Sequence, residues 1–329
     1  MELCMSIPAH FSALLLSVTF SSFLLASPAN KIFEQTFATA IVLSDNDAIS
    51  IGIANFNPDT LLNPNENDLS EDDSIALRNE LDIYNLPYTF VLDKQNEEWS
   101  DKVMLRLTYI KQESNNEFLG DIREVPDSNI DKIYSLYSAY SHYIPVANKL
   151  KLRLRLGAYI MHYKNKHHYN SAFSNNLKPF VDGVIYNTIA IAAIIEPNAK
   201  LTYTQETNWG KWQLASDLNY FVGKVYSGSK SSIGAVPDGW RINNGVKLHF
   251  DLNSSALHAE SIYLNFKRID MHGDMTDPLQ TNHYYEMGVG LLLDTHKFTN
   301  LAKNIGIGLN INKGTSLSGG SIVIYFNEF

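Results

Sequence analysis

The feature that most constrains the fold of this chain is a strict two-residue alternation of apolar and polar side chains. Between residues 149 and 156 every second residue is leucine, and the residues between the leucines are lysines and arginines. Successive side chains of a β-strand point to opposite faces, so only a strand separates these two sets. The same alternation recurs in 240–250, 285–293 and 303–312. The chain is therefore predicted to be all-β.

The length of the alternating segments favours a membrane barrel over a soluble protein. A soluble sandwich has the same alternation, because one face of its sheets is also buried. Its strands, however, usually have about 5–6 residues, whereas a tilted membrane strand needs about 9–11, the length of the segments found here. Eighteen tyrosines, many near the expected strand ends, suit the aromatic girdles of a membrane barrel. We expect an antiparallel transmembrane β-barrel.

The alternating segments and the polar stretches between them predict about twelve strands. We place the strands near 47–56, 76–93, 101–111, 131–143, 149–163, 182–206, 210–222, 240–251, 257–269, 281–294, 303–312 and 319–329. Long polar connections alternate with short ones along the chain, as in bacterial outer-membrane barrels, where long loops face outward. This arrangement places both chain termini in the periplasm.

Two segments leave the strand count open between twelve and fourteen. Residues 182–206 are long for one strand, and a turn at Glu196-Pro197-Asn198 would divide them. Residues 31–44 fit either a strand or a helix with an apolar stripe. We expect twelve strands, with 31–44 as a short helix in or below the lumen. The resulting divisions are 1–29, an N-terminal segment 30–46 and a barrel 47–329.

The first 29 residues are predicted to be a signal peptide. Residues 11–26 form an uncharged apolar run that is short for a spanning helix, which needs about 20 residues. The small residues of Ala26-Ser-Pro-Ala29 suit cleavage after Ala26 or Ala29; an uncleaved membrane anchor is the alternative. The single cysteine, Cys4, precedes the run. The mature chain is therefore expected to have no disulfide and no thiolate metal site.

The other end of the chain is a further apolar strand that finishes on Phe329. Val323 and Tyr325 share the face of Phe329, while Asn327 stands where an apolar residue is usual. An exposed terminal strand invites aggregation unless closure of a barrel pairs it. We expect the barrel-assembly machinery to read this aromatic end, with periplasmic chaperones as partners during biogenesis.

These features resemble the translocator barrel of autotransporters. Glu196-Pro-Asn-Ala-Lys-Leu-Thr-Tyr203 is similar to the Glu-Pro-x-Ala-x-Leu-x-Tyr stretch found inside such barrels. The resemblance covers residues 31–329 and implies a helix in the pore before the first strand. Only about twenty residues separate the cleavage site from the first expected strand, so the chain resembles the solitary autotransporter-like barrels, which have no passenger domain.

The most prominent candidate site is a basic row on the polar face of the fifth expected strand. Its members are Lys149, Lys151, Arg153 and Arg155. Because the leucines need lipid, these side chains are expected to point into the lumen, where they would form an anion-attracting wall. The alternative is a structural ladder of ion pairs with the acids expected in the lumen. Those acids are Glu80, Asp82, Asp217 and Glu286.

Other polar clusters give weaker indications. His162, His167 and His168 could bind a metal, but solvated loop histidines explain them equally well. The acidic stretch 57–74 lacks the glycine turn and spacing of a calcium site. Asp270, His272, Asp274 and Asp277 are the nearest approach to a hydrolase site in one expected outer loop. We predict no metal, no cofactor and no enzymatic activity.

The favoured function is that of an integral outer-membrane barrel with a structural, pore-like or surface-interaction role. Its expected partners are outer-membrane lipid and lipopolysaccharide. The net charge of -9 and the lack of a basic patch argue against nucleic acid. The alternatives are a barrel enzyme that hydrolyses lipids or peptides, and a secreted soluble β-sandwich adhesin. Detergent-dependent extraction separates the adhesin from the barrels, and an activity screen separates the two barrels.

Overall fold

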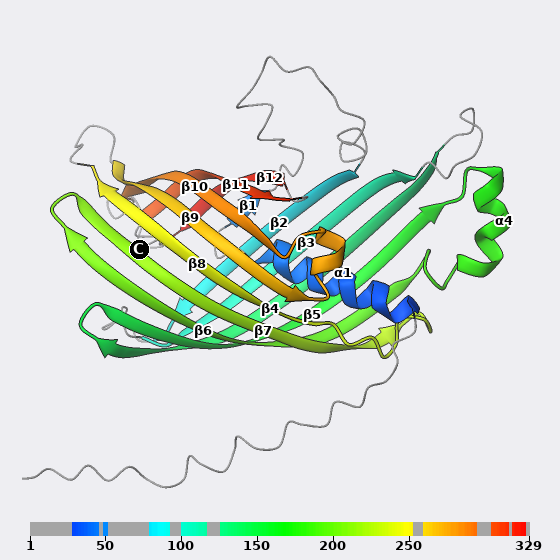
Figure 1. The fold of residues 1–329 in the computed structure, drawn as a ribbon, viewed down its shortest axis with the longest axis horizontal. Helices are drawn as coiled ribbons and strands as arrows, with labels where there is room; N and C mark the ends of the chain where they lie inside the picture. Colours follow the sequence, from blue (N-terminus) through cyan, green and yellow to red (C-terminus); the bar gives the residue numbers. More distant parts are fainter. Residues whose placement is uncertain are drawn as a thin grey trace, which may run out of the picture.

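The computed structural model describes residues 28–45, 49–51, 79–92, 100–116, 126–252, 259–294, 304–315 and 318–326. Its twelve strands form one closed antiparallel sheet (Figure 1). In chain order they are β1 (Ile49–Ile51), β2 (Asn79–Val91), β3 (Lys102–Asn116), β4 (Asp127–Ala147), β5 (Leu150–His168), β6 (Ile189–Thr207), β7 (Gly210–Gly228), β8 (Asp238–Asp251), β9 (Ala259–Gly273), β10 (His283–Asp294), β11 (Asn304–Gly314) and β12 (Ser318–Phe326).

The barrel closes where the first strand meets the last. Ile49 of β1 pairs with Ile324 of β12, and Ser50 pairs with Asn85 of β2. Every other neighbouring pair is consecutive in sequence. The prediction of twelve strands is confirmed, and the soluble sandwich is wrong because a single sheet closes on itself.

The outer wall is apolar and the inner wall is polar, as the alternation predicts. On β5 the side chain of Leu156 is 61% exposed and that of Arg153 only 8%. On β11 Ile307 and Leu309 point outward, while Gly306 and Gly308 line the interior. Exposed aliphatic side chains on a closed barrel face lipid. Among the described residues, no helix combines the length and apolar character needed to cross a membrane.

Helix α1 (Pro28–Ser44) lies inside the barrel. Phe33, Phe37 and Ile41 follow one another at the four-residue spacing of a helix face, and all three are fully buried. The rings of Phe33 and Phe37 meet the ring of Tyr163 on β5 edge-on, with centroids 5.9 and 6.4 Å away. The prediction of a helix in the lumen is therefore confirmed.

The two ends of the barrel differ in their connections. At one end, called here the loop end, the strands are joined through residues 52–78, 117–126, 169–188, 229–237, 274–282 and 315–317. These include the short helices α4 (Ala172–Val181) and α5 (Thr276–Leu279). At the other end, called the turn end, β4–β5 and β6–β7 are joined by two residues each. Long connections on one side match an outer-membrane barrel.

Helix α1 begins at the loop end. The Nζ of Lys31 lies 2.5 Å from the Oδ1 of Asp274, which directly follows β9. The carboxylate of Glu34 accepts a hydrogen bond from the amide of Val236 in the β7–β8 connection. Both chain termini lie outside the described residues, so their expected place at the turn end stays a prediction. In the described part, α1 begins at the loop end and β12 runs toward the turn end.

Several strand boundaries also differ from the prediction. β6 begins at Ile189 rather than residue 182 and passes through Pro197 without a turn. Its register against β7 is the same on both sides of Glu196 and Pro197. Strands β3, β4, β5, β7 and β9 reach farther toward the loop end than predicted. The backbone ladder continues there after the lipid-facing leucines have ended, so hydrophobic alternation underestimates strand length. The acidic stretch 57–74 lies outside the described residues.

Candidate functional site

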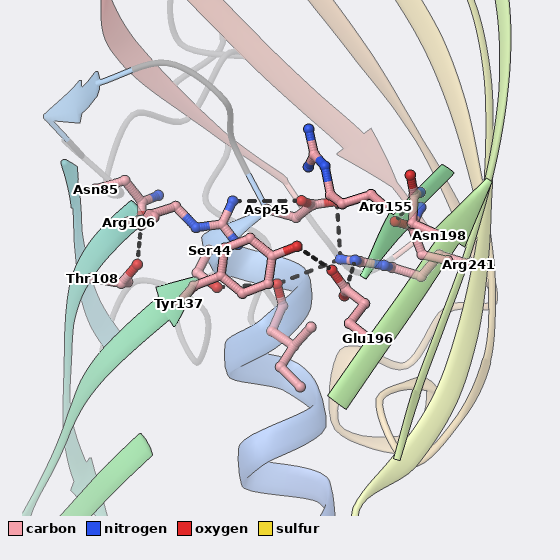
Figure 2. Close-up of polar contacts among 12 residues, drawn as sticks. Ser44, Asp45, Asn85, Arg106, Thr108, Tyr137, Arg155, Glu196, Asn198 and Arg241 are labelled. Carbon is pink, nitrogen blue, oxygen red and sulfur yellow. Dashed lines mark hydrogen bonds and ion pairs between the residues drawn. The ribbon is translucent and has the colours of Figure 1, made fainter. Parts of the chain in front are cut away.

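A buried cluster of charged side chains occupies the middle of the lumen (Figure 2). Arg241 on β8 donates to Glu196 on β6 at 2.9 Å, and its other terminal nitrogen lies 3.2 Å from Asp45, just after α1. Arg106 on β3 approaches the second Asp45 oxygen at 3.6 Å. Asp45 therefore lies between two guanidinium groups from opposite parts of the wall.

Two tyrosines complete this central cluster, which we define as Asp45, Arg106, Tyr137, Tyr159, Glu196 and Arg241. Both hydroxyl groups donate to Glu196, from 3.2 and 3.3 Å, and Arg106 donates to the Tyr159 hydroxyl at 3.2 Å. The Arg106 guanidinium also stands 4.7 Å from the Tyr137 ring centroid. Gly157 makes room for this ring, since a Cβ there would come within 2.4 Å of it.

Burial makes the central cluster sensitive to the loss of any charge. Arg106, Arg241 and Glu196 are each at most 2% exposed. Desolvating ions is costly, and the cost is offset only when the partners and hydrogen bonds are all in place. Here two carboxylates face two guanidinium groups, and Arg241 also donates to the Ile41 carbonyl at 3.4 Å. Cations beside the last carbonyls of a helix are favourable, so the cluster fixes the end of α1.

Between the central cluster and the turn end the lumen contains a polar cavity of about 230 Å³. Its wall carries six basic and three acidic side chains. They are Arg153, Arg155, Lys200, Arg241, Lys247 and Lys267, with Asp45, Asp217 and Glu286. Two ion pairs along the wall join these sets. Arg153 on β5 lies 3.5 Å from Asp217 on β7, and Lys267 lies 2.8 Å from Glu286 on the neighbouring strand. The cavity wall thus has an excess of positive charge.

Three of the four residues of the predicted basic row point into the lumen. Arg153 donates to Asn198 at 3.0 Å as well as facing Asp217, and Arg155 donates to the Ser141 hydroxyl at 3.2 Å. Lys151 lies 5.8 Å from the Tyr143 ring. Lys149 is the exception, because it occupies the β4–β5 turn with a φ of 72° and is exposed. The row is partly a ladder of pairs and partly a cavity wall.

The acids expected to pair with this row divide between the two faces. Asp217 and Glu286 lie in the lumen as predicted. Asp82 does not: it pairs in register with Lys111, which is outward, while Asn85 is the buried inward residue on β2. Glu80 has the same parity in β2 as Asp82. Polar alternation alone does not say which face of an amphipathic strand end is inside.

The three histidines near the loop end do not converge. His167 points inward, with its ring 3.9 Å from that of Tyr186, whereas His162 and His168 point outward from the same strand. All three belong to β5, whereas only His162 was expected within the strand at 149–163. Beside them in the β5–β6 connection, burial raises the pKa of Tyr169 to about 12, aided by Asp182. Within the described part of the chain, no group of three metal-ligating side chains is found.

The acids of the candidate hydrolase site are likewise used elsewhere. Asp274 pairs with Lys31 and so holds α1, while Asp277 accepts only an exposed hydrogen bond from Gln35. Asp270 points outward and pairs with Arg268 at 2.7 Å. His272, also on the outer face of β9, packs near Trp240, with ring centroids 5.6 Å apart.

On the terminal strand, Val323 faces the interior. It pairs with Gly308 and is fully buried beside Tyr263 and Leu292. Tyr325 follows at the same parity, opposite Gly306, while Ile324 lies opposite the lipid-facing Ile307. Phe329 lies outside the described residues. The outward apolar side chains of β12 are thus those in register with Ile322 and Ile324, not Val323. Glycines on β11 leave space inside the barrel for Val323.

The sequence reasoning missed the central cluster as a unit. Glu196 and Arg241 were recognised only as part of a resemblance and of a polar face. The available signal was the presence of ionisable residues in the middle of lipid-spanning strands: Arg106 lies between two leucines, and Glu196 follows two isoleucines. Such residues face a bundle or barrel interior and require partners. Strand pairing alone places Arg106 and Tyr137 opposite each other.

Comparison with known proteins agrees with this architecture. Residues 34–328 match the family described as the solitary outer membrane autotransporter β-barrel domain. No individually curated protein gives a significant match to the sequence.

Three solved structures resemble the chain at low identity. The transport unit of the autotransporter AIDA-I from Escherichia coli is 13% identical over 92% of this chain and 99% of its own, with a TM-score of 0.48. The translocator domain of NalP from Neisseria meningitidis is 10% identical over 75% and 78%, with a TM-score of 0.45. A FadL homologue from Pseudomonas aeruginosa is 11% identical over 75% and 65%, with a TM-score of 0.34. On the match of its family across nearly the whole barrel, the chain belongs to the solitary outer membrane autotransporter β-barrel domain family.

Proposed function

We propose that this protein is an outer-membrane pore that α1 holds closed and that conducts small anions when α1 leaves the central cluster. The observation that carries the proposal is the position of Asp45 between Arg106 and Arg241, at 3.6 and 3.2 Å. A single side chain at the end of α1 faces two buried cations of the wall, and Glu196 supplies the second negative charge. Displacing the helix exposes both guanidinium groups to the lumen.

The charge of the cavity supports the choice of anions. Six basic and three acidic side chains line the space between the cluster and the turn end. Charged rings in a pore select ions of the opposite sign. Removal of Asp45 from this wall leaves the positive excess larger, so the open state should prefer anions more strongly than the cavity alone suggests.

Single-channel recording of the refolded mature protein tests the proposal. Asp45→Ala should raise the open probability, and the open channel should have a reversal potential that favours chloride over potassium. Gln35→Ala is the matched control, because Gln35 makes only an exposed hydrogen bond to Asp277. Equal open probabilities in the two variants, or a cation-selective open state, would contradict the proposal.

Chemical labelling provides an independent readout of helix position. Ile41 is fully buried, and the sequence has no cysteine after Cys4. In an Ile41→Cys variant, a water-soluble thiol reagent should react slowly with the closed protein and faster when Asp45→Ala is added. Labelling rates that do not change with Asp45→Ala would show that this residue does not fix α1.

Export and assembly remain part of the proposal. We infer that the N-terminal apolar run is removed by cleavage after Ala26 or Ala29, so N-terminal sequencing of membrane-extracted protein should begin at Ser27 or Asn30. Recovery of Met1 would contradict this. We also infer that the assembly machinery reads Phe329. Deleting it should reduce heat-modifiable protein in the outer-membrane fraction, and wild-type levels would show that the terminal aromatic is not the signal.

A further inference from the structure

The outer wall over β2–β5 carries three tiers of side chains that continue in register from strand to strand. The lowest tier is aliphatic: Leu86, Leu107, Leu136 and Ile160, each between 45% and 56% exposed. The middle tier is aromatic: Tyr84, Tyr109, Tyr134 and His162, whose neighbouring ring centroids are 6.1, 5.1 and 6.2 Å apart. Aliphatic followed by aromatic side chains marks the boundary between hydrocarbon and headgroups.

The third tier is basic and lies two residues beyond the rings. Lys111 pairs in register with Lys132, and Lys132 pairs with Lys164. Lys166 follows on β5, one step nearer the loop end. Two residues of a strand span about 7 Å, so the lysines stand just above the aromatic tier, at the depth of lipid headgroups.

The charges of this tier are only partly balanced within the protein. Lys111 pairs with Glu113 at 2.6 Å, and Asp82 adjoins Lys111 on β2. Among the described residues, no ion pair joins Lys132, Lys164 or Lys166 to an acid. Like charges directly opposite each other on adjacent strands repel. Placing Lys132 opposite Lys164 therefore disfavours the strand pair unless an anion lies between them.

A groove of about 630 Å³ runs below the lysines. It is lined by the aromatic tier and the aliphatic tier, and its side-chain surface is almost wholly apolar. An acyl chain fits such a groove, while a charged group fits the lysines above it. The two features lie on the same four strands, so one amphipathic molecule can occupy both.

We propose that this wall is a binding site for a phosphorylated glycolipid of the outer leaflet. Its phosphate groups would lie between Lys132, Lys164 and Lys166, and an acyl chain would lie in the groove. The loop end, where the long connections are, faces the cell exterior in this assignment. The proposal concerns the outer wall alone and does not depend on conduction through the lumen.

Two outward basic side chains on the opposite wall are arranged differently. On β9 the outward Arg268 is held by both oxygens of Asp270, at 2.7 and 3.0 Å. On β7 the outward Lys224 stands opposite Ala193. Neither position places two lysines side by side. Lys224 is thus a matched control for a charge change on the same outer surface at the loop end.

Native mass spectrometry of the refolded mature protein in nanodiscs tests the site. The probes are bis-phosphorylated lipid A, the same lipid after dephosphorylation, phosphatidylglycerol and free inorganic phosphate. The wild-type protein should retain lipid A. The double variant Lys132→Gln/Lys164→Gln should bind about 30-fold more weakly, since each lysine near a membrane contributes about fivefold. Lys224→Gln should bind as the wild type does.

The four probes decide between the sources of the anion. Retention of lipid A with loss on dephosphorylation supports the proposal. Equal retention of phosphatidylglycerol, or full displacement by free phosphate at the same concentration, overturns it. Unchanged binding by the double variant also overturns it. If that variant does not refold, a salt series on the wild-type protein decides, because lipid A retention that does not weaken with salt excludes a phosphate–lysine site.

Discussion

The two halves of the lumen are built from the same twelve strands but are filled in opposite ways. Near the loop end, α1 replaces water with Phe33, Phe37 and Ile41, and the strand residues around it are buried and apolar. Near the turn end, the wall residues are charged and surround a cavity of about 230 Å³. The central cluster separates the two halves. The same barrel wall thus surrounds a packed interior where the helix is inserted and a cavity where it is not.

The largest effect is expected where the two halves meet. Glu196→Gln leaves Arg241 with Asp45 as its remaining carboxylate partner, and breaking a buried ion pair costs about 3–5 kcal/mol. Asp217→Asn in the turn-end half is the control. Its partner Arg153 keeps a hydrogen bond to Asn198, and the Arg153–Asp217 pair is longer, at 3.5 Å, so the cost should be clearly smaller. Urea unfolding of protein refolded into lipid vesicles measures both. Equal costs would remove the distinction between the halves.

The second prediction concerns two substitutions on the lipid face, with one inward substitution for comparison. Leu156→Arg places a charge on the lipid face far from both strand ends, which should cost about 2–4 kcal/mol in unfolding free energy. Leu152→Arg lies two residues from the turn, where the cost falls to about 0–1 kcal/mol. Arg153→Leu, on the inner face between them, should still allow refolding. Costs that do not follow membrane depth in this way would show that the faces are assigned incorrectly.

The third prediction concerns a tightly packed position in the turn-end half of the lumen. Gly290 lies against the Tyr263 ring, and a Cβ there would come within 2.3 Å of it. Gly290→Ala should therefore cost about 1–3 kcal/mol through overpacking. Gly319→Ala has no atom within 4 Å of the new Cβ and should be nearly neutral. The difference in denaturation midpoint between the two variants is the measurement. No difference would mean that Tyr263 moves freely into the cavity.

The smallest effect on stability is expected in the cavity wall itself. Lys247 lies 5.1 Å from the Tyr263 ring centroid, and such a contact contributes about 0.5–1 kcal/mol. Lys200→Gln and Lys247→Gln should therefore each change the unfolding free energy by at most about 1 kcal/mol. In the Asp45→Ala background, however, the pair should reduce the preference for anions. The reversal potential in a salt gradient measures this. An unchanged potential would place the selective part of the pore elsewhere.

The outer wall was the most predictable part of the fold. The leucines between residues 150 and 156, and the isoleucines and leucine between 305 and 311, had to face lipid. A strict period of two specifies a strand and its faces together. The helix α1 was predictable for a similar reason, because Phe33, Phe37 and Ile41 repeat at a helical spacing. In both cases one element contains the whole signal.

The candidate site was less predictable because it is assembled from separate elements. Arg106, Glu196 and Arg241 come from three strands, and Asp45 comes from the segment after α1. Alternation shows that each points inward but gives neither its height in the barrel nor its neighbour across the lumen. The misplacement of Asp82 has a related cause. At the strand ends both faces are polar, so the period no longer distinguishes the inside from the outside.

The route of α1 also constrains the order in which the barrel can form. The helix starts at the loop end and its chain leads directly into β1, whose partner β12 is the last strand made. Residues far apart in sequence meet only in the final step, when the entropy of closing a large loop has to be overcome. If β1 and β12 pair before α1 has entered the interior, the helix must afterwards thread through one end of the closed barrel. Entry of α1 before closure avoids this threading, so the order of the two events is expected to set how quickly the lumen is filled.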